Sequence, residues 1–541
     1  MKRLYHWIDR NFIELGREMR WSYLPPLMVY MAAGVSGLTG LVGTFFVKEY
    51  LGLSAAFLAA LGFWAGIPWA LKMPVGHLVD LLWRWKAALV YLGAGLIAGS
   101  IAIMIGLIGS PQAMREIMSA ESWFVLSVLL APIGYVMQDA VADAMTVEAV
   151  PRFEADGTPV PEDTRRLMNT TMQTLGRVAI IGGSVLVSLA NVVMFAGTES
   201  LPQDAKVTIY LDIYRMALVI PLLSVAGVAW AGWLHRRRRR QLIAGGAAAD
   251  TIADLDRPGG DGLTRPNWWI LGGSLLFAVI TVGVGLSGLA HGQEIIFVGS
   301  FAVIAFLMSR LLRELEAGAR NTLLGTAIVI FVFRALPGPG AGSTWWMIDE
   351  LGFDQSFLAR LSLIGASLTL AGLFLFRRMM AERSIAWIVT FLTVAGTALA
   401  LPILGMYHGL HEWTAARTAG VVDARFIAIF DTALESPLGQ IAMVPMLAWI
   451  ANSAPSHLKA TFFAVMASFT NLALSASQLG TKYLNQIFVV SREVRDPAGA
   501  AVVTPADYGD LGNLLLAVTA IGLLLPLLTI LLTRLAGLRS A

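Results

Sequence analysis

Three carboxylates that follow an apolar stretch are the residues best placed to do chemistry. Asp139, Asp143 and Glu148 fall within ten residues, directly after the apolar residues 123–137. Asp139 and Asp143 are four residues apart, so on a helix they share one face, one turn from each other. An ionised group at mid-membrane costs about 2.5–3.5 kcal/mol on insertion scales, so it usually faces a polar cavity or a partner. The pattern therefore predicts a polar path through a membrane, with Asp139 and Asp143 as proton-coupling or cavity residues.

The composition indicates a polytopic helical membrane protein. Of the 541 residues, 57% are hydrophobic and 14% are charged, whereas an average soluble protein has about 25% charged residues. Repeated apolar runs near 20 residues long are sufficient to cross a bilayer as helices. The chain has no cysteine, which excludes disulfides and thiolate metal sites. The net charge is only +3, and basic residues gather beside the apolar runs, a pattern of membrane topology rather than of nucleic-acid binding.

Fourteen membrane spans are expected, in three groups. The first six are expected at 23–46, 53–76, 87–108, 123–147, 170–193 and 212–234. Two more form a tight hairpin, at 267–289 and 294–312. The last six are expected at 321–337, 357–376, 384–406, 426–451, 460–488 and 511–535. Basic residues fall on alternate connections between these spans, which predicts an inner-membrane protein with both termini in the cytoplasm.

These groups define the expected domains. Residues 1–22 mix basic and apolar residues and predict an interfacial N-terminal helix, with a solvated tail as the alternative. Six-helix bundles are expected at 23–235 and 321–541, separated by a basic cytoplasmic linker at 236–266 and an extra transmembrane hairpin within 267–320. Two such bundles around a central path form the major facilitator fold, an all-α polytopic architecture. The arginine run in the linker predicts retention on the cytoplasmic side and is compatible with binding of anionic lipid headgroups.

A charged motif between spans two and three is predicted to act in conformational change. Gly76 is followed by Asp80 and then Arg84, which resembles a signature of the major facilitator superfamily. The glycine would allow close helix approach, and the two charges would contact the partner half in one access state only. An ordinary charged turn is the alternative. At the end of span four, Glu148 is expected to form a cytoplasmic gate with a basic residue such as Arg152.

Several segments, in order along the chain, resemble the folate-biopterin transporter family of the major facilitator superfamily. The segments are Pro68–Asp80, Asp139–Glu148, Asp349–Leu358, Ser436–Pro445 and Lys459–Asn471. Met73 departs from the family's pattern, because the proline expected after Lys72 comes one place later. The resemblance covers most of 23–235 and 321–535, and it leaves 241–320 outside the usual twelve-span pattern. It implies secondary transport of a folate, pterin or related planar metabolite.

Proton-coupled transport needs an ionisable group whose protonation is linked to substrate occupancy. Asp139 and Asp143 fit this role, with Lys72 and Arg177 from neighbouring spans as candidate counter-charges. A static charge network that only orients the helices is the alternative. In the second half, two further carboxylates lie four residues apart and are candidates for proton coupling or substrate recognition, namely Asp431 and Glu435.

Other residues are candidates for substrate binding. A planar anion such as a pterin–glutamate conjugate would stack on aromatic rings and pair with a guanidinium, as Trp345, Trp346 and Arg334 could provide. An interfacial belt is the alternative for the two tryptophans. Polar residues of spans ten and eleven line the path or bond between helices, namely Gln440, Asn471 and Gln478.

Enzymatic function and ATP-driven transport find no support in the motifs. The seven histidines lack a metal-ligand spacing such as His-Glu-x-x-His, and no phosphate-binding Gly-x-x-x-x-Gly-Lys-Ser/Thr is present. We therefore expect a symporter that works by alternating access, without cofactor or metal, and whose partners are a small molecule, protons and the bilayer. The alternatives are a muropeptide or drug permease, and a non-transporting assembly factor for a pigment or protein complex that docks through the extra hairpin.

Overall fold

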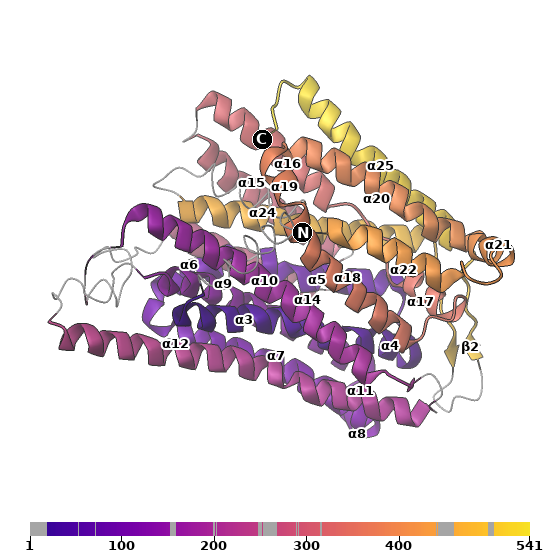
Figure 1. The fold of residues 1–541 in the computed structure, drawn as a ribbon. Helices are drawn as coiled ribbons and strands as arrows, with labels where there is room; N and C mark the ends of the chain where they lie inside the picture. Colours follow the sequence, from indigo (N-terminus) through magenta and orange to yellow (C-terminus); the bar gives the residue numbers. More distant parts are fainter. Residues whose placement is uncertain are drawn as a thin grey trace, which may run out of the picture.

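In the part of the chain that the structure describes, the fold consists of long helices with broadly similar axes and a two-stranded sheet near the C-terminal end (Figure 1). The computed structural model describes residues 19–51, 53–70, 72–151, 158, 160–198, 201, 203–246, 252, 268–287, 289, 291–313, 316–439, 441, 459–495 and 502–540. In these residues, ten helical stretches are long and apolar enough to cross a membrane. The protein is therefore a multi-pass membrane protein. The interfacial helix expected at 1–22 falls almost entirely outside the described residues, as does most of the linker beyond 246.

The first half contains helices at each of the first six expected spans. They are α3 (Leu24–Gly34), η3 (Val35–Thr39), α4 (Gly40–Tyr50), α5 (Ala55–Ala70), α6 (Lys72–Leu81), α7 (Lys86–Gly109), α8 (Pro111–Ile117), α9 (Ala120–Ala149), α10 (Glu162–Met194), α11 (Gln203–Ala217) and α12 (Val219–Ala244). The short 3-10 turns η2 (Trp21–Tyr23) and η4 (Trp83–Trp85) precede α3 and α7. The first span is thus bent at a 3-10 segment, and the second is divided between α5 and α6.

The extra hairpin and the second half complete the fold. Their elements are α14 (Trp268–Leu286), α15 (Gly292–Leu312), α16 (Ala317–Arg334), α17 (Ala341–Asp349), α18 (Gln355–Leu375), α19 (Arg377–Glu382), α20 (Ile385–Tyr407), α21 (Leu410–Arg417), α22 (Ala424–Glu435), η6 (Ser436–Leu438), α24 (Lys459–Ile487), β1 (Val494–Arg495), β2 (Val502–Thr504) and α25 (Leu511–Leu535). Strands β1 and β2 pair in antiparallel fashion. Of the expected span 426–451, helix is described only up to Glu435, where Pro437 and a 3-10 turn follow.

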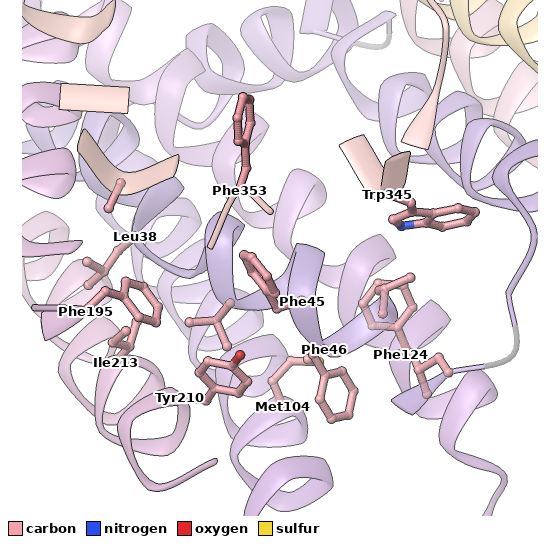
Figure 2. Close-up of a cluster of buried hydrophobic side chains, with 14 of the residues drawn as sticks. Leu38, Phe45, Phe46, Met104, Phe124, Phe195, Tyr210, Ile213, Trp345 and Phe353 are labelled. Atoms are coloured by element: carbon pink, nitrogen blue, oxygen red, sulfur yellow. The ribbon is translucent and has the colours of Figure 1, made fainter. Parts of the chain in front are cut away.

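The two ends of the molecule differ in charge and in packing. We call the end that carries Arg236–Arg240 the basic end, and the opposite one the far end. At the far end, the largest apolar cluster joins both halves, because Phe45 and Tyr210 of the first half belong to the same cluster as Trp345 and Phe353 of the second (Figure 2). All four side chains are almost fully buried. Hydrophobic packing therefore holds the halves together at the far end.

Two helix pairs form the main contact between the halves. Helix α5 packs along α24, and α10 packs along α18. The α5–α24 seam is close because α5 presents small residues there: a Cβ built on Gly62 would lie 2.7 Å from Oε1 of Gln478, and one on Gly66 would lie 3.2 Å from Oγ of Ser475. Small residues at such positions let two membrane helices approach each other closely.

The tip of the α14–α15 hairpin touches both halves near the far end. Helix α15 packs on α24 and α16 of the second half. At the start of α15, Gln293 donates from Nε2 to the carbonyl oxygen of Ala60 in α5, at 3.0 Å. Lys482 of α24 donates from Nζ to Oε1 of Gln293 at 3.0 Å and to Oε1 of Glu294 at 2.9 Å. The tip of the hairpin therefore spans the α5–α24 seam.

The close packing of α7 on α9 can be tested by mutation. A Cβ built on Gly134 would lie 2.5 Å from the carbonyl oxygen of Gly93, so Gly134→Leu must push the two helices apart. Overpacking of this kind costs about 1–3 kcal/mol or more. We expect a clearly lower unfolding temperature for Gly134→Leu, measured by thermal unfolding in detergent. Gly95→Leu, at a position on α7 with no atom within 4 Å of the added Cβ in the described residues, should unfold like the native protein; equal losses in both variants would contradict this packing.

Candidate functional site: a charge cluster in the first half

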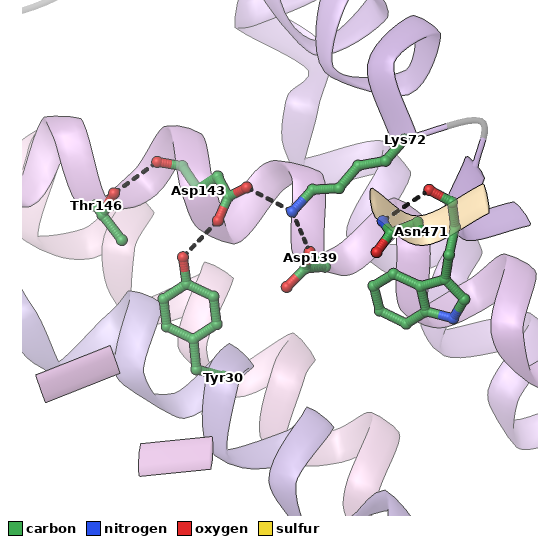
Figure 3. A network of polar contacts seen from close by, with 7 residues as sticks. Tyr30, Lys72, Asp139, Asp143, Thr146 and Asn471 are labelled. Atoms are coloured by element: carbon green, nitrogen blue, oxygen red, sulfur yellow. Dashed lines mark hydrogen bonds and ion pairs between the residues drawn. The ribbon is translucent and has the colours of Figure 1, made fainter. Parts of the chain in front are cut away.

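A lysine held between two carboxylates forms the candidate site (Figure 3). Nζ of Lys72 lies 2.5 Å from Oδ2 of Asp139 and 2.8 Å from Oδ2 of Asp143. The hydroxyl of Tyr30 donates to Oδ1 of Asp143 at 2.6 Å. Asp139 is the most enclosed of the charged groups, with 15% of its side chain exposed, against 45% for Asp143. The cluster therefore has an inner carboxylate and an outer one that share a single ammonium.

Local sequence explains how three helices bring these groups together. Asp139 and Asp143 lie one turn apart on α9, which is why one side chain can reach both. Lys72 is the first residue of α6, just after the interruption of the second span. Pro74 favours that interruption, because it has no N–H to donate to the carbonyl of Ala70 four residues before it. Tyr30 comes from α3, where its ring lies against Gly176 of α10.

Arg177 contributes a second positive charge. Its position on α10 lets it interact electrostatically with Asp139 and with the Tyr30 hydroxyl. The hydroxyl of Thr146 donates to the backbone carbonyl of Asp143 at 2.7 Å. Asp139, Asp143, Lys72 and Arg177, which the sequence analysis selected as one functional group, are thus brought together by the fold.

One residue of the second half reaches this region. Asn471 of α24 donates from Nδ2 to the carbonyl oxygen of Trp69 at 3.1 Å (Figure 3). Trp69 lies in the last turn of α5, where helix carbonyls have no partner within their own helix. In the structure, the Asn471 amide is thus engaged with backbone of the first half.

The residues predicted to act as latch or gate are placed only in part. Glu148 accepts from Nζ of Lys86 at 2.5 Å, and the Lys86 ammonium lies 3.9 Å from the ring centre of Trp83. Among the described residues, no atom lies within 4 Å of a Cβ built on Gly76. Arg152 and the side chains of Asp80 and Arg84 lie outside the described residues.

The predicted substrate residues of the second half do not join the charge cluster. Arg334 donates from Nε to the carbonyl oxygen of Thr470 at 3.1 Å. Trp345 and Trp346 are 2% and 5% exposed and belong to the far-end core. The interfacial-belt interpretation is therefore wrong for this pair, because α17 turns both indoles inward. Gln478 lies at the α5–α24 seam beside Gly62.

Three predicted polar residues remain. Asp431 is buried in α22, with 6% of its surface exposed, and α22 packs against α18 and α20. Glu435, one turn further along α22, is exposed. The two carboxylates therefore differ in exposure, but Glu435 still lies close enough to interact electrostatically with Asp431. Gln440 lies outside the described residues.

A polar network at the far end was missed by sequence reasoning. Lys48 of α4 forms an ion pair with Asp349 of α17, and Tyr508 donates its hydroxyl to the same carboxylate. Burial and the adjacent Asp349 raise the pKa of Tyr508, so the phenol stays protonated and remains a donor. Nη1 of Arg492 donates to the carbonyl oxygen of Leu53 at 2.9 Å. The Lys48–Asp349 and Arg492–Leu53 contacts join the halves, and these residues lie too far apart in sequence for spacing to reveal them.

Comparison with known proteins identifies the family. The model of the BT1 family matches residues 268–538. The chain belongs to the BT1 family. The matched range begins at the α14–α15 hairpin, in residues that the motif comparison placed outside the family's pattern. A folate-biopterin transporter of Synechocystis sp. is 22% identical over 466 residues, which are 86% of this chain and 74% of that protein.

Solved structures agree on the fold. A POT family transporter in complex with 5-aminolevulinic acid superposes with a TM-score of 0.56 at 13% identity, over 96% of both chains. The nucleoside transporter NupG superposes with a TM-score of 0.52 at 11% identity, over 94% of this chain and 98% of that one. The BT1 family protein is thus a membrane transporter of the major facilitator fold, and it is not an enzyme.

The shared ammonium predicts a non-additive response to mutation. Lys72→Met leaves two carboxylates facing each other in an enclosed site, and removing one partner of a buried pair costs about 3–5 kcal/mol. Adding Asp139→Asn should recover part of that loss, with a coupling energy of about 0.5–3 kcal/mol. Thermal or denaturant unfolding of the single and double variants measures this. Strictly additive losses would show that the ammonium and the Asp139 carboxylate do not depend on each other.

Proposed function

We propose that this BT1 family transporter is an inner-membrane symporter that moves a folate, pterin or related planar anion together with protons. The observation that carries the proposal is the ion cluster of Lys72 with Asp139 and Asp143. The printed name of the Synechocystis relative supports the substrate class. Positively charged connections favour cytoplasmic termini, and the expected fourteen spans, with α14 and α15 as the extra pair, belong to the same proposal.

The charge of the cluster gives protons a direct influence on an anionic substrate. The two cations Lys72 and Arg177 with two ionised carboxylates carry a formal charge of 2 − 2 = 0, whereas protonation of Asp139 leaves +1. An anion approaching at close range is therefore attracted more strongly once Asp139 is protonated. Protonation also frees the Lys72 ammonium to donate to a substrate carboxylate. Proton binding would therefore precede or accompany substrate binding.

The difference in packing between the two ends supports alternating access. Hydrophobic packing and the Lys48–Asp349 pair join the halves at the far end, so the described conformation is one that is closed there. The opposite state requires these contacts to break, and substrate and protons must bind the two states differently to shift the equilibrium. The roles of Arg334, Gln478 and Asp431 as further cavity residues remain part of the proposal.

Uptake into proteoliposomes tests the transport reaction. With labelled folate or pterin, an inward proton gradient should raise accumulation several-fold over that without a gradient. Asp139→Asn should abolish this gain while retaining substrate exchange, because it removes the titrating group and leaves the path. Asp212→Asn, which alters an exposed pair within α11, serves as the control and should keep the gain.

Three results would overturn this assignment. Uptake of muropeptide or drug in place of folate and pterin would favour a permease of another specificity. A protein that moves none of these substrates, and co-purifies with a stoichiometric partner lost on deleting residues 267–312, would favour the assembly factor. Full proton dependence in both Asp139→Asn and Asp143→Asn would remove the cluster from the mechanism.

The far-end closure makes a separate prediction in this cysteine-free chain. Ser356→Cys places a thiol at a site that is 2% exposed, beside Gln355, whose amide donates to the Tyr210 hydroxyl of the other half at 2.9 Å. A membrane-impermeant maleimide should label it slowly, and Asp349→Asn should raise the rate by weakening the ion pair with Lys48. Asp212→Asn, which alters an exposed pair within α11, should not. Equal labelling rates in Ser356→Cys alone and in its combinations with Asp349→Asn and Asp212→Asn would contradict a gate at Asp349.

A further inference from the structure

We propose that Asn471 is a positioning residue that couples the charge cluster to the movement of the second half. The inference rests on the proposed function and deepens it, because it names how the protonation state of the first half is transmitted. Asn471 was a candidate for contact with substrate. Its amide instead reaches across the α5–α24 seam to the carbonyl oxygen of Trp69.

The position of Trp69 is what gives this hydrogen bond its effect. The carbonyl belongs to the last turn of α5, and Lys72 begins α6 only three residues later. Three residues of chain span at most about 10 Å, so a displacement at Trp69 is passed to Lys72 with little slack. The ammonium contacts at 2.5 and 2.8 Å tolerate shifts of only a few tenths of an ångström before they weaken.

Asn471 ties the end of α5 to the opposite half. Helix α24 belongs to the second half and packs along both α5 and α6 of the first. When the second half moves, α24 moves with it, whereas the charge cluster stays with α9 of the first half. When the halves rock, either the Asn471 bond breaks or Lys72 is drawn away from Asp139. In the converse direction, loss of the Asp139 charge loosens Lys72 and with it the carbonyl that Asn471 holds. The coupling is thus mutual, as thermodynamic linkage requires.

The effect must pass through the cluster, because an amide does not titrate in this range. The helices packed around α6 and α9 also bring Tyr30 from α3 and Arg177 from α10 near the two carboxylates. Lys86 of α7 is engaged with Glu148. Any change in proton dependence on replacing Asn471 therefore reports on the Lys72 cluster and its neighbours.

The same helix offers a matched control. Asn485 of α24 also donates from Nδ2 to a backbone carbonyl, that of Pro339 at 3.3 Å, but both partners lie in the second half. Asn471→Leu removes one asparagine-to-carbonyl bond between the halves, whereas Asn485→Leu removes two within the second half, to Pro339 and to Thr481. Only the first should affect the link between the halves.

The experiment measures coupling through the labelling rate of the Ser356→Cys thiol. In that background Asp139→Asn should raise the rate, because it releases Lys72. With Asn471→Leu present, Asp139→Asn should lose most of this effect, a change of about five-fold for one net hydrogen bond. With Asn485→Leu present, Asp139→Asn should keep its full effect. Asn471→Ser, which shortens the side chain beyond reach of the carbonyl, repeats the test if the leucine variant does not fold.

The possible outcomes distinguish a failure of the Asn471 role from a failure of the transport proposal. If Asp139→Asn changes the rate equally with and without Asn471→Leu, the role of Asn471 is overturned and the transport proposal stands. If Asp139→Asn has no effect even in the otherwise native chain, the cluster does not drive opening and both proposals fall. If Asn485→Leu removes the effect as fully as Asn471→Leu, the effect comes from a general destabilisation of α24, and the specific role of the Asn471–Trp69 bond is overturned.

Discussion

The position of one ammonium between two carboxylates is the constraint on which the proposed mechanism depends. Taking charges out of water is expensive, and a buried ion pair often stabilises a protein no more than an apolar replacement would. Lys72, Asp139 and Asp143 nevertheless meet between two membrane helices, α6 and α9. Their arrangement has a use that an apolar core could not supply, because its net charge becomes more positive on protonation. We interpret the cost of enclosing these charges as the basis of proton dependence.

The ion cluster lies within the first half, whereas the contacts that must change during transport lie between the two halves. The far end is closed by apolar packing and by Lys48 with Asp349, whereas the ion cluster is built from α6 and α9 of the first half, with Tyr30 of α3. The α5–α24 seam joins these regions, and it carries the Asn471 bond as well as the hairpin contact at Ala60. A rocking motion must therefore be accommodated along this seam.

Sequence reasoning succeeded where the signal was local and periodic. Apolar runs of about 20 residues predicted the helices, and the four-residue spacing predicted that Asp139 and Asp143 share a face. Lys72 followed as a counter-charge because its span is adjacent. Tyr30 could not be found this way, since a single hydroxyl in an apolar helix has no spacing to mark it. Lys48 with Asp349, and Asn471 with Trp69, are contacts across some 300 residues or more, which depend on how the halves pack. The belt interpretation of Trp345 and Trp346 was wrong. Aromatic residues near the end of a span often lie at the membrane interface, whereas α17 places these two indoles in the core.

Proton flux driven by substrate is the most direct test of the central claim. Liposomes containing the purified protein and a pH-sensitive dye, prepared without a pH gradient, would receive unlabelled folate or pterin on one side. The account predicts that protons move with the substrate and change the internal pH, and that Asp139→Asn abolishes the pH change while substrate still exchanges. Substrate movement with no pH change in the native protein would contradict it.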